Sequence, residues 1–231
     1  METKKGYENY DKVHVAIDCV IFGYYERQLQ VLLIQRDFEP VVGEWSLIGG
    51  ILSEDEDLDA ASQRILKYNT GLDNVFMEHV HVFGKVHRDP LARVVSVMYY
   101  ALINPIDYNH KLIPRMGAKW FPINNIPKLI FDHEEMLKMA FDTLKKKITR
   151  MPIGFELLPP KFTMPELIQL YEAILQKSLD KRNLSKKIFS LKILRKHNEK
   201  QFNTSKKGAF LYSFDKRKYE ALTKKGFLFE I

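Results

Sequence analysis

The chain has 231 residues, of which 45% are hydrophobic and 28% are charged, so it is long enough for one large or two modest globular domains. Its single cysteine, Cys19, excludes an internal disulfide framework and a cysteine-rich metal site. No apolar run approaches the length of a membrane span, and the first residues lack the apolar core of a signal peptide, so we expect a cytoplasmic protein.

The net charge of +7 is distributed unevenly along the sequence. Residues 1–150 contain 19 Lys and Arg against 21 Asp and Glu, whereas residues 151–231 contain 17 against 8. A basic last third beside a nearly neutral body suggests a polyanionic partner for that third alone. A solvated lysine-rich surface would give the same charge.

Several segments of the first 150 residues predict strands or helices. Residues 13–23 and 29–34 are rich in β-branched and aromatic residues, and the polar sequence between them predicts a turn. Residues 93–103 have the strongest strand composition in the chain. An apolar stripe from about Asp132 to Ile148 predicts an amphipathic helix that closes this first domain.

Residues 53–72 predict a helix that begins in an acidic run and ends at Gly71. Ser53 and Glu56 have the spacing of a capping box, and the acidic side chains at 54–59 complement the positive end of the helix dipole. The acidic run also allows a metal site, although a solvated helix start is the simpler interpretation.

Residues 79–87 alternate as a β-strand does. The alternation places one set of side chains on a single face, namely His79, His81, Phe83, Lys85 and His87. The simplest interpretation is a half-buried strand whose polar side meets water. A strand that lines a polar pocket for a hydroxyl-rich ligand is the sharper alternative, and a zinc site formed by the histidines is the weakest.

The last third of the chain predicts a pair of helices suited to DNA. Residues 153–163 predict a short strand interrupted by two prolines. Thr163 and Glu166 form a capping box for the helix that follows, and Asp180 is a good N-cap for a second helix over 181–191. Two helices across a short turn, the second with a basic polar face, have helix-turn-helix geometry.

Residues 191–219 predict two strands around a polar tip, which is the form of a hairpin wing. Lys200, Lys206 and Lys207 are placed to meet phosphates. The order of the predicted elements is that of a winged helix, provided that the 132–148 helix counts as its first. A basic helical dimerisation tail is the structural alternative.

Residues 49–72, GGILSEDEDLDAASQRILKYNTGL, resemble the Nudix box, whose pattern is G, five residues, E, seven residues, R-E-U-x-E-E-x-G-U, with U aliphatic. The positions that match are Gly50, Glu56, Arg64, Leu66, Gly71 and Leu72. The three glutamates of R-E-U-x-E-E are replaced by Ile65, Tyr68 and Asn69. Nudix hydrolases hold divalent cations with those glutamates, and Ile and Tyr provide no carboxylate. We therefore expect no hydrolysis, no catalytic residue, no metal and no cofactor.

Together with residues 88–102, 118–133 and 155–183, the degenerate box resembles the NrtR-type, Nudix-related transcription regulators. The resemblance covers almost the whole chain. It implies an α+β protein with a Nudix-like α/β/α sandwich over residues 1–150 and a winged helix-turn-helix domain over 151–231, the 132–148 helix being shared at the boundary. It also implies a homodimer that binds a palindromic operator in double-stranded DNA and responds to a small effector.

The resemblance leaves two effectors open. Members that govern NAD metabolism sense ADP-ribose, and a sugar-sensing branch senses L-arabinose and is commonly a repressor that the sugar releases. A diphosphate would favour converging arginines or a kept cation cluster, and the cluster is lost. We therefore expect a pentose effector and a repressor of sugar-utilisation genes. The side chains expected at the effector are Glu44, Lys85, His87 and Asp89.

The second helix of the last third is expected to enter the major groove, and the wing to add affinity that weakens with salt. The residues expected at the DNA are Lys181, Arg182, Asn183, Ser185, Lys186, Lys206 and Lys207.

Two other function classes remain open. A divergent Nudix hydrolase would use Glu44, Glu54 or Glu56 as its carboxylates and would turn over ADP-ribose with magnesium. A binding adaptor would use the basic last third for RNA or an acidic protein and would not bind duplex DNA.

Overall fold

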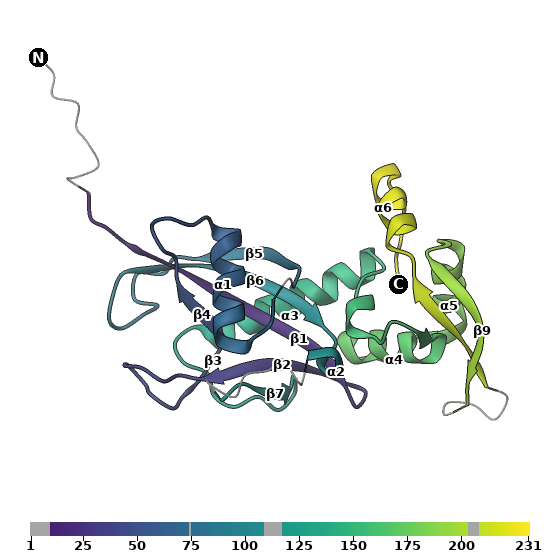
Figure 1. Ribbon diagram of the computed structural model, residues 1–231, viewed down its shortest axis with the longest axis horizontal. Coiled ribbons are helices and arrows are strands. Elements are labelled where there is room, and N and C mark those ends of the chain that lie inside the picture. Colours follow the sequence, from purple (N-terminus) through teal and green to yellow (C-terminus); the bar gives the residue numbers. More distant parts are fainter. Residues whose placement is uncertain (1–9, 74, 109–116, 203–207) are drawn as a thin grey trace, which may run out of the picture.

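The computed structural model describes residues 10–73, 75–108, 117–202 and 208–231 (Figure 1). Its N-terminal part is built on a seven-stranded sheet of order β3-β2-β1-β6-β5, in which β4 also pairs with β1 and β7 with β2. The strands are β1 (His14–Tyr25), β2 (Gln28–Gln35), β3 (Trp45–Ser46), β4 (Ile48–Ile51), β5 (Met77–Phe83), β6 (Val94–Ile103) and β7 (Lys119–Pro122). The long strands β1 and β6 run parallel at its centre.

The alternation of side chains along β1 separates two hydrophobic cores. Ile17 and Ile21 belong to the core that contains residues of α1 (Leu58–Thr70). Val20 and Phe22 belong to the core that contains residues of α3 (His133–Arg150). The two helices therefore cover opposite faces of the sheet (Figure 1), which confirms the predicted α/β/α sandwich. A short helix, α2 (Pro105–Tyr108), follows β6.

The predicted strands over 13–23, 29–34 and 93–103 are confirmed as β1, β2 and β6. The turn between β1 and β2 has only two residues, Glu26 and Arg27, whose φ angles are 49° and 62°. Two positive φ angles give the tight turn that matches the twist of a hairpin.

The helix after the acidic run begins later than its sequence predicts. Asp57 is the N-cap of α1, and its carboxylate accepts a hydrogen bond from the Ala60 N–H at 2.8 Å. Glu56 accepts from the Ser53 N–H at 2.8 Å, but that contact closes a turn that precedes the helix, so the predicted capping box is wrong. The C-terminus is as expected, because Gly71 adopts the left-handed conformation with φ 77°.

The predicted alternation over 79–87 is wrong beyond its first residues. The pairing of β5 with β6 shifts register between His79 and His81, and the strand ends at Phe83. Lys85 and His87 consequently lie in a turn and share no strand face with the histidines. Within the described parts of the chain, no group of three His, Cys, Asp or Glu residues could hold a metal ion. None of the described helices is long and apolar enough to span a membrane.

The C-terminal part contains a three-stranded sheet of order β8-β10-β9 and three α-helices, and it confirms the predicted winged helix. Its elements are β8 (Phe162–Thr163), α4 (Met164–Leu175), α5 (Lys181–Ser190), β9 (Leu194–Gln201), β10 (Ala209–Phe214) and α6 (Lys216–Lys225). The capping box predicted at Thr163 and Glu166 is present at the start of α4, and Asp180 caps α5.

Two elements of this part differ from the prediction. The strand expected over 153–163 is limited to β8 at its end, and a 3-10 helix, η3 (Phe155–Leu157), entered through Gly154 at φ 91°, lies within the segment. Phe155 and Leu157 are buried on either side of an exposed residue, so their spacing imitates a strand. The helix α6 lies where the end of the wing was expected, and no residue of α6 is fully buried.

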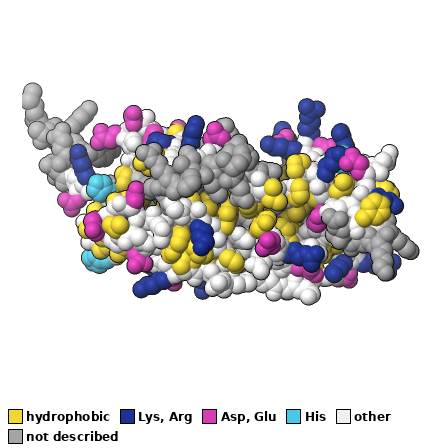
Figure 2. All heavy atoms as spheres, turned by 60° about the horizontal axis from the view of Figure 1, so that its bottom comes forward, with side chains coloured by type: hydrophobic (Ala, Val, Ile, Leu, Met, Phe, Trp, Pro, Cys, Tyr) yellow, Lys and Arg dark blue, Asp and Glu magenta, His cyan; other side chains and the backbone are white. Residues whose placement is uncertain are grey.

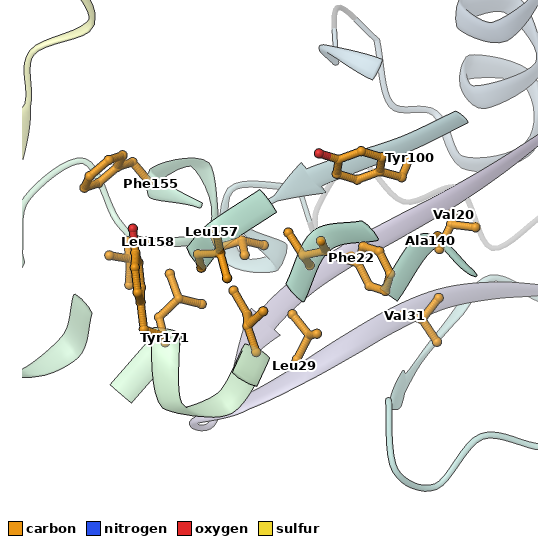
Figure 3. Packing of buried hydrophobic residues seen from close by; sticks show 14 of the residues in the cluster. Val20, Phe22, Leu29, Val31, Tyr100, Ala140, Phe155, Leu157, Leu158 and Tyr171 are labelled. Carbon is orange, nitrogen blue, oxygen red and sulfur yellow. The ribbon is translucent and has the colours of Figure 1, made fainter. Parts of the chain in front are cut away.

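One hydrophobic core joins the two parts of the molecule. Phe22 and Leu29 of the sheet, Ala140 of α3, Phe155 of η3 and Tyr171 of α4 belong to the same buried cluster (Figure 3). The hydroxyl of Tyr171 donates to the carbonyl oxygen of Ile153 at 3.2 Å. On the surface, Lys and Arg side chains gather over the winged helix, and hydrophobic side chains lie between it and the sheet (Figure 2).

Candidate functional site

A cavity of about 330 Å³ opens at the end of the sheet beside the Nudix box. Its walls come from β1, β2, β4, α1, the turn after β5 and the residues that precede α3. Three of the lining side chains are arginines, Arg36, Arg64 and Arg88. Three others are aromatic, Phe38, Tyr68 and Phe131.

The arginines differ in how firmly the protein holds them. The side chain of Arg88 is only 3% exposed and donates two hydrogen bonds to Asp132, at 2.8 and 2.9 Å. Arg64 donates to Glu56 at 2.8 Å and to the Ile51 carbonyl oxygen at 2.9 Å.

Arg36 is held by an aromatic face and by backbone. Its guanidinium carbon lies 3.8 Å from the ring centre of Phe38 and 5.5 Å from that of Phe131. Its Nε donates to the Phe38 carbonyl oxygen at 3.1 Å. No carboxylate forms an ion pair with Arg36 among the described residues, so this guanidinium is available to an anionic ligand.

The floor of the cavity is a buried polar cluster around Asp18. Ser96 donates to Asp18 at 2.5 Å, and Nη2 of Arg88 lies 3.5 Å from the same carboxylate oxygen. His133 approaches the other oxygen through Nε2 at 3.8 Å, while its Nδ1 accepts from the Leu47 N–H at 3.1 Å. The acceptor role of Nδ1 assigns the proton to Nε2. Burial lowers the pKa of His133 despite the two nearby carboxylates.

The residues at the Nudix glutamate positions do not fit a divalent cation. Ile65 is buried, and Tyr68 is 63% exposed. The side-chain amide of Asn69 donates to the Ile65 carbonyl oxygen at 2.8 Å. Glu56, the one box carboxylate that remains, is bound by Arg64, whose hydrogen bonds lower its pKa to about 2. A hard cation requires several free oxygen ligands, and these side chains do not offer them.

Only one of the four residues expected at the effector lines this cavity. Asp89 does so, and its carboxylate also accepts from the Leu91 N–H at 2.8 Å. Lys85 and His87 line a neighbouring, more open recess that shares Arg88 and Phe131 with the cavity, and there Lys85 forms an ion pair with Glu135 at 2.6 Å. Glu44 is exposed on the loop before β3 and lines neither recess. The early end of β5 explains the displacement of Lys85 and His87.

Five of the seven residues expected at the DNA lie together on α5. Asp180 accepts from the backbone N–H groups of Arg182 and Asn183, both at 3.0 Å, which fixes the first turn of the helix. The side chains of Lys181, Arg182, Asn183 and Lys186 are exposed, whereas Ser185 is half-buried. The Ser185 hydroxyl donates to the Lys181 carbonyl oxygen at 2.7 Å. Lys206 and Lys207 lie outside the described residues.

The pocket arginines could not be found from sequence spacing. Arg88 binds Asp18 across 70 positions and Asp132 across 44. Such pairs are created by the sheet order, which brings distant segments together. One local signal was available, because Arg64 falls on the invariant arginine of the box pattern.

Both parts of the chain match known families. Residues 12–140 match the NUDIX domain, and residues 154–214 match the NrtR DNA-binding winged helix domain. The ADPR responsive transcriptional repressor NtrR of Acinetobacter baylyi is 32% identical over 216 residues, which cover 92% of this chain and 86% of the relative. The ADP-ribose pyrophosphatase of Methanocaldococcus jannaschii is 33% identical over 135 residues, 58% of this chain and 76% of the relative.

A solved structure extends the similarity to the complete fold. The crystal structure of Shewanella oneidensis NrtR complexed with a 27mer DNA has a TM-score of 0.81 and 27% identity, and the match covers 89% of this chain and 95% of that one. The chain thus belongs to the NrtR-type transcription regulators, which join a Nudix domain to a DNA-binding winged helix.

Proposed function

We propose that this protein is a transcription regulator in which ADP-ribose, bound in the Nudix pocket, controls operator binding by the winged helix. The observation that carries the proposal is the convergence of Arg36, Arg64 and Arg88 on one cavity with aromatic walls. Guanidinium groups match the geometry of phosphate oxygens, and the aromatic rings provide surfaces on which a purine stacks.

This effector replaces the pentose that the sequence favoured. The pentose was preferred because the cation cluster is lost, but converging arginines are the other arrangement that suits a diphosphate. The comparisons give no support to arabinose. Both curated relatives have names that refer to ADP-ribose, and one of them is named as a repressor.

Calorimetric titration tests the effector. We expect ADP-ribose to bind in the presence of EDTA, because arginines and not a cation would neutralise its diphosphate. We expect L-arabinose to give no heat of binding. Binding of L-arabinose without binding of ADP-ribose would overturn the proposed effector.

Operator recognition is assigned to α5 and the wing. Lys181, Arg182, Asn183 and Lys186 are exposed on one basic helix, which suits contacts to base edges and phosphates. Ser185 completes the set, and Lys206 and Lys207 are proposed to add phosphate contacts from the wing. A homodimer on a palindromic operator and a domain boundary near residue 150 are parts of the same proposal.

Hydrolysis of ADP-ribose is the second candidate, and the similarity to a pyrophosphatase favours it. The replaced box carboxylates and the pairing of Glu56 with Arg64 argue against it. Incubation with ADP-ribose and magnesium separates the two, since a regulator without hydrolytic chemistry leaves the nucleotide intact. Formation of AMP and ribose 5-phosphate would establish the enzyme.

A further inference from the structure

Arg88 lines the pocket and also contacts the start of α3, the helix that leads away from the pocket. Its Nε and Nη2 donate to the two oxygens of Asp132 at 2.9 and 2.8 Å, and Nη2 lies 3.6 Å from the sulfur of Met136. In the part of the chain that the structure describes, Nη1 of Arg88 donates no hydrogen bond, although the residue lines the cavity. One side of the guanidinium is thus committed to protein carboxylates, and the other is available to a ligand.

Asp132 occupies the N-cap position of α3 but does not cap it. Its side chain makes no capping hydrogen bond to the helix, because both of its oxygens are engaged by Arg88. The residues on either side, Phe131 and His133, line the cavity. Phe131 has a φ angle of 49°, an uncommon conformation for an aromatic residue that the surrounding structure must hold in place. The wall of the pocket and the first turn of α3 are therefore one continuous unit.

The far end of α3 is joined to the end of α4 by a side-chain hydrogen bond and to α5 through the C-terminal residues 230 and 231. With 18 residues, α3 spans about 27 Å. Lys145 donates to the side chain of Gln176, the C-cap of α4, at 2.8 Å. The Thr149 carbonyl oxygen accepts from the Ile231 N–H at 3.2 Å, and the neighbouring Glu230 carbonyl oxygen accepts from Lys187 of α5.

Packing along α3 favours movement as a rigid body. Its buried side chains, Met136, Leu137, Ala140, Leu144 and Ile148, form one stripe within the core that also holds α4. Close-packed interiors transmit small displacements because they have few voids to absorb them. A shift of the first turn therefore changes the position of the last turn and of the helices attached to it.

We infer that Asp132 is a positioning residue that couples the Nudix pocket to the DNA-reading helix α5, an inference that rests on the proposed function. A diphosphate oxygen bound at Nη1 of Arg88 brings negative charge beside the Asp132 carboxylate. Arg88 is then shared between two anions, its attachment to Asp132 weakens, and the first turn of α3 moves. The affinity for the effector therefore differs between the original and the displaced position of α3. Such a difference in affinity is what allows a ligand to shift the populations of two conformations.

The test uses Asp132→Asn, which keeps the size of the side chain and removes its charge. Asp142→Asn is the matched control, because it makes the same chemical change at an exposed position of α3 that does not line the pocket. For each protein, the operator Kd is measured with and without saturating ADP-ribose, and the ratio is the coupling factor. Linkage requires operator DNA to change the ADP-ribose Kd by the same factor, which provides an internal check.

We expect the Asp142→Asn protein to retain the coupling factor of the parent, and the Asp132→Asn factor to fall to within about twofold of one. Binding of operator alone and of ADP-ribose alone should remain measurable in both variants, which a merely destabilised protein would not show. Asp132→Glu keeps the charge and should keep most of the coupling. A coupling factor in Asp132→Asn equal to that of the parent would overturn the role of Asp132.

Measurements on the parent protein distinguish a failure of the proposed function from a failure of the coupling through Asp132. An operator Kd that does not respond to ADP-ribose in the parent would overturn the proposed function and the coupling with it. A responsive parent with an equally responsive Asp132→Asn variant would overturn the coupling alone. If Asp132→Asn does not fold, hydrogen exchange on the parent decides, since ADP-ribose must alter protection in both α3 and α5. Unchanged protection in α3 would exclude this route.

Discussion

At the residue scale, Arg36 is the pocket arginine without an ionic partner among the described side chains, whereas Arg64 and Arg88 already bind carboxylates. Removal of Arg36 therefore costs contacts to the ligand and leaves no buried carboxylate unpaired. Hydrogen bonds to charged groups contribute about 1.5–3 kcal/mol, so Arg36→Ala should weaken ADP-ribose binding about 10–150-fold.

Calorimetry measures this effect, with Lys85→Ala as the control. Lys85 lines a different recess and is paired with Glu135, so its removal should leave the ADP-ribose affinity unchanged. A larger loss in Lys85→Ala than in Arg36→Ala would show that the ligand occupies the other recess.

Because the pKa of His133 differs between the folded and unfolded states, we expect the free energy of unfolding to depend on pH. Burial lowers its pKa in the folded protein, whereas the unfolded chain keeps a value of about 6.5. Below that pH the unfolded state binds a proton that the folded state resists, so the free energy of unfolding falls as pH decreases through about 6.5. The stability that the neutral imidazole confers is complete above that value.

Thermal unfolding measured from about pH 7.5 to pH 5.5 checks the direction. His133→Asn keeps an acceptor for the Leu47 N–H and should flatten the dependence, whereas His81→Asn on the exposed edge should not. An equal slope in the parent and in His133→Asn would place the responsible group elsewhere.

At the element scale, α5 is the helix proposed to contact the operator, and Arg182 is an exposed side chain on its first turn. An arginine that contacts a base or phosphate contributes about 1–3 kcal/mol, so Arg182→Ala should weaken operator binding about 5–150-fold while ADP-ribose binding is unchanged. Arg150→Ala removes the same charge from the exposed end of α3 and is the control. Equal losses in the two variants would indicate a general effect of charge and not a specific contact.

Elements with strong local signals agree with their sequence-based prediction. The strands β1, β2 and β6 have long β-branched runs, and α4 and α5 begin at clear caps. The elements that differ have ambiguous local patterns. The buried spacing of η3 imitates a strand, α6 has no fully buried side chain, and a bulge interrupts the alternation of β5.

The pocket was harder to predict from the sequence than the fold, because the residues that line it come from many segments of the chain. Asp89 could be named from the sequence as a possible effector residue, but the buried cluster of Asp18, Ser96, Arg88 and His133 exists only after the sheet has formed. No spacing rule joins positions separated by 70 or more residues. The sequence of the box shows that its three glutamates are replaced by Ile65, Tyr68 and Asn69, and the structure adds that Glu56 is paired with Arg64.

At the scale of the whole molecule, the shared core predicts that the two parts unfold together. Leu144 of α3 is fully buried between sheet and winged helix, so Leu144→Ala should lower the free energy of unfolding by about 2–5 kcal/mol. The exposed Lys146→Ala is the control and should have little effect.

Comparison of the unfolding transitions seen by two spectroscopic probes tests whether the two parts of the molecule unfold together. Trp45 and Trp120 both report on the sheet, and far-UV circular dichroism reports on both parts. We expect coincident transitions in the parent and in Leu144→Ala. A helical transition separated from the tryptophan transition would show two independent units and would remove the physical basis for coupling through α3.

The central claim is that a Nudix pocket without hydrolytic carboxylates controls a DNA-binding winged helix in response to ADP-ribose. It is tested most directly by fluorescence anisotropy on a labelled duplex from the region upstream of the protein's own gene. The account predicts that ADP-ribose raises the operator Kd about 5–150-fold, the range of ordinary allosteric coupling, and that L-arabinose leaves the Kd unchanged. An operator Kd that is indifferent to ADP-ribose, or that responds to L-arabinose instead, would contradict it.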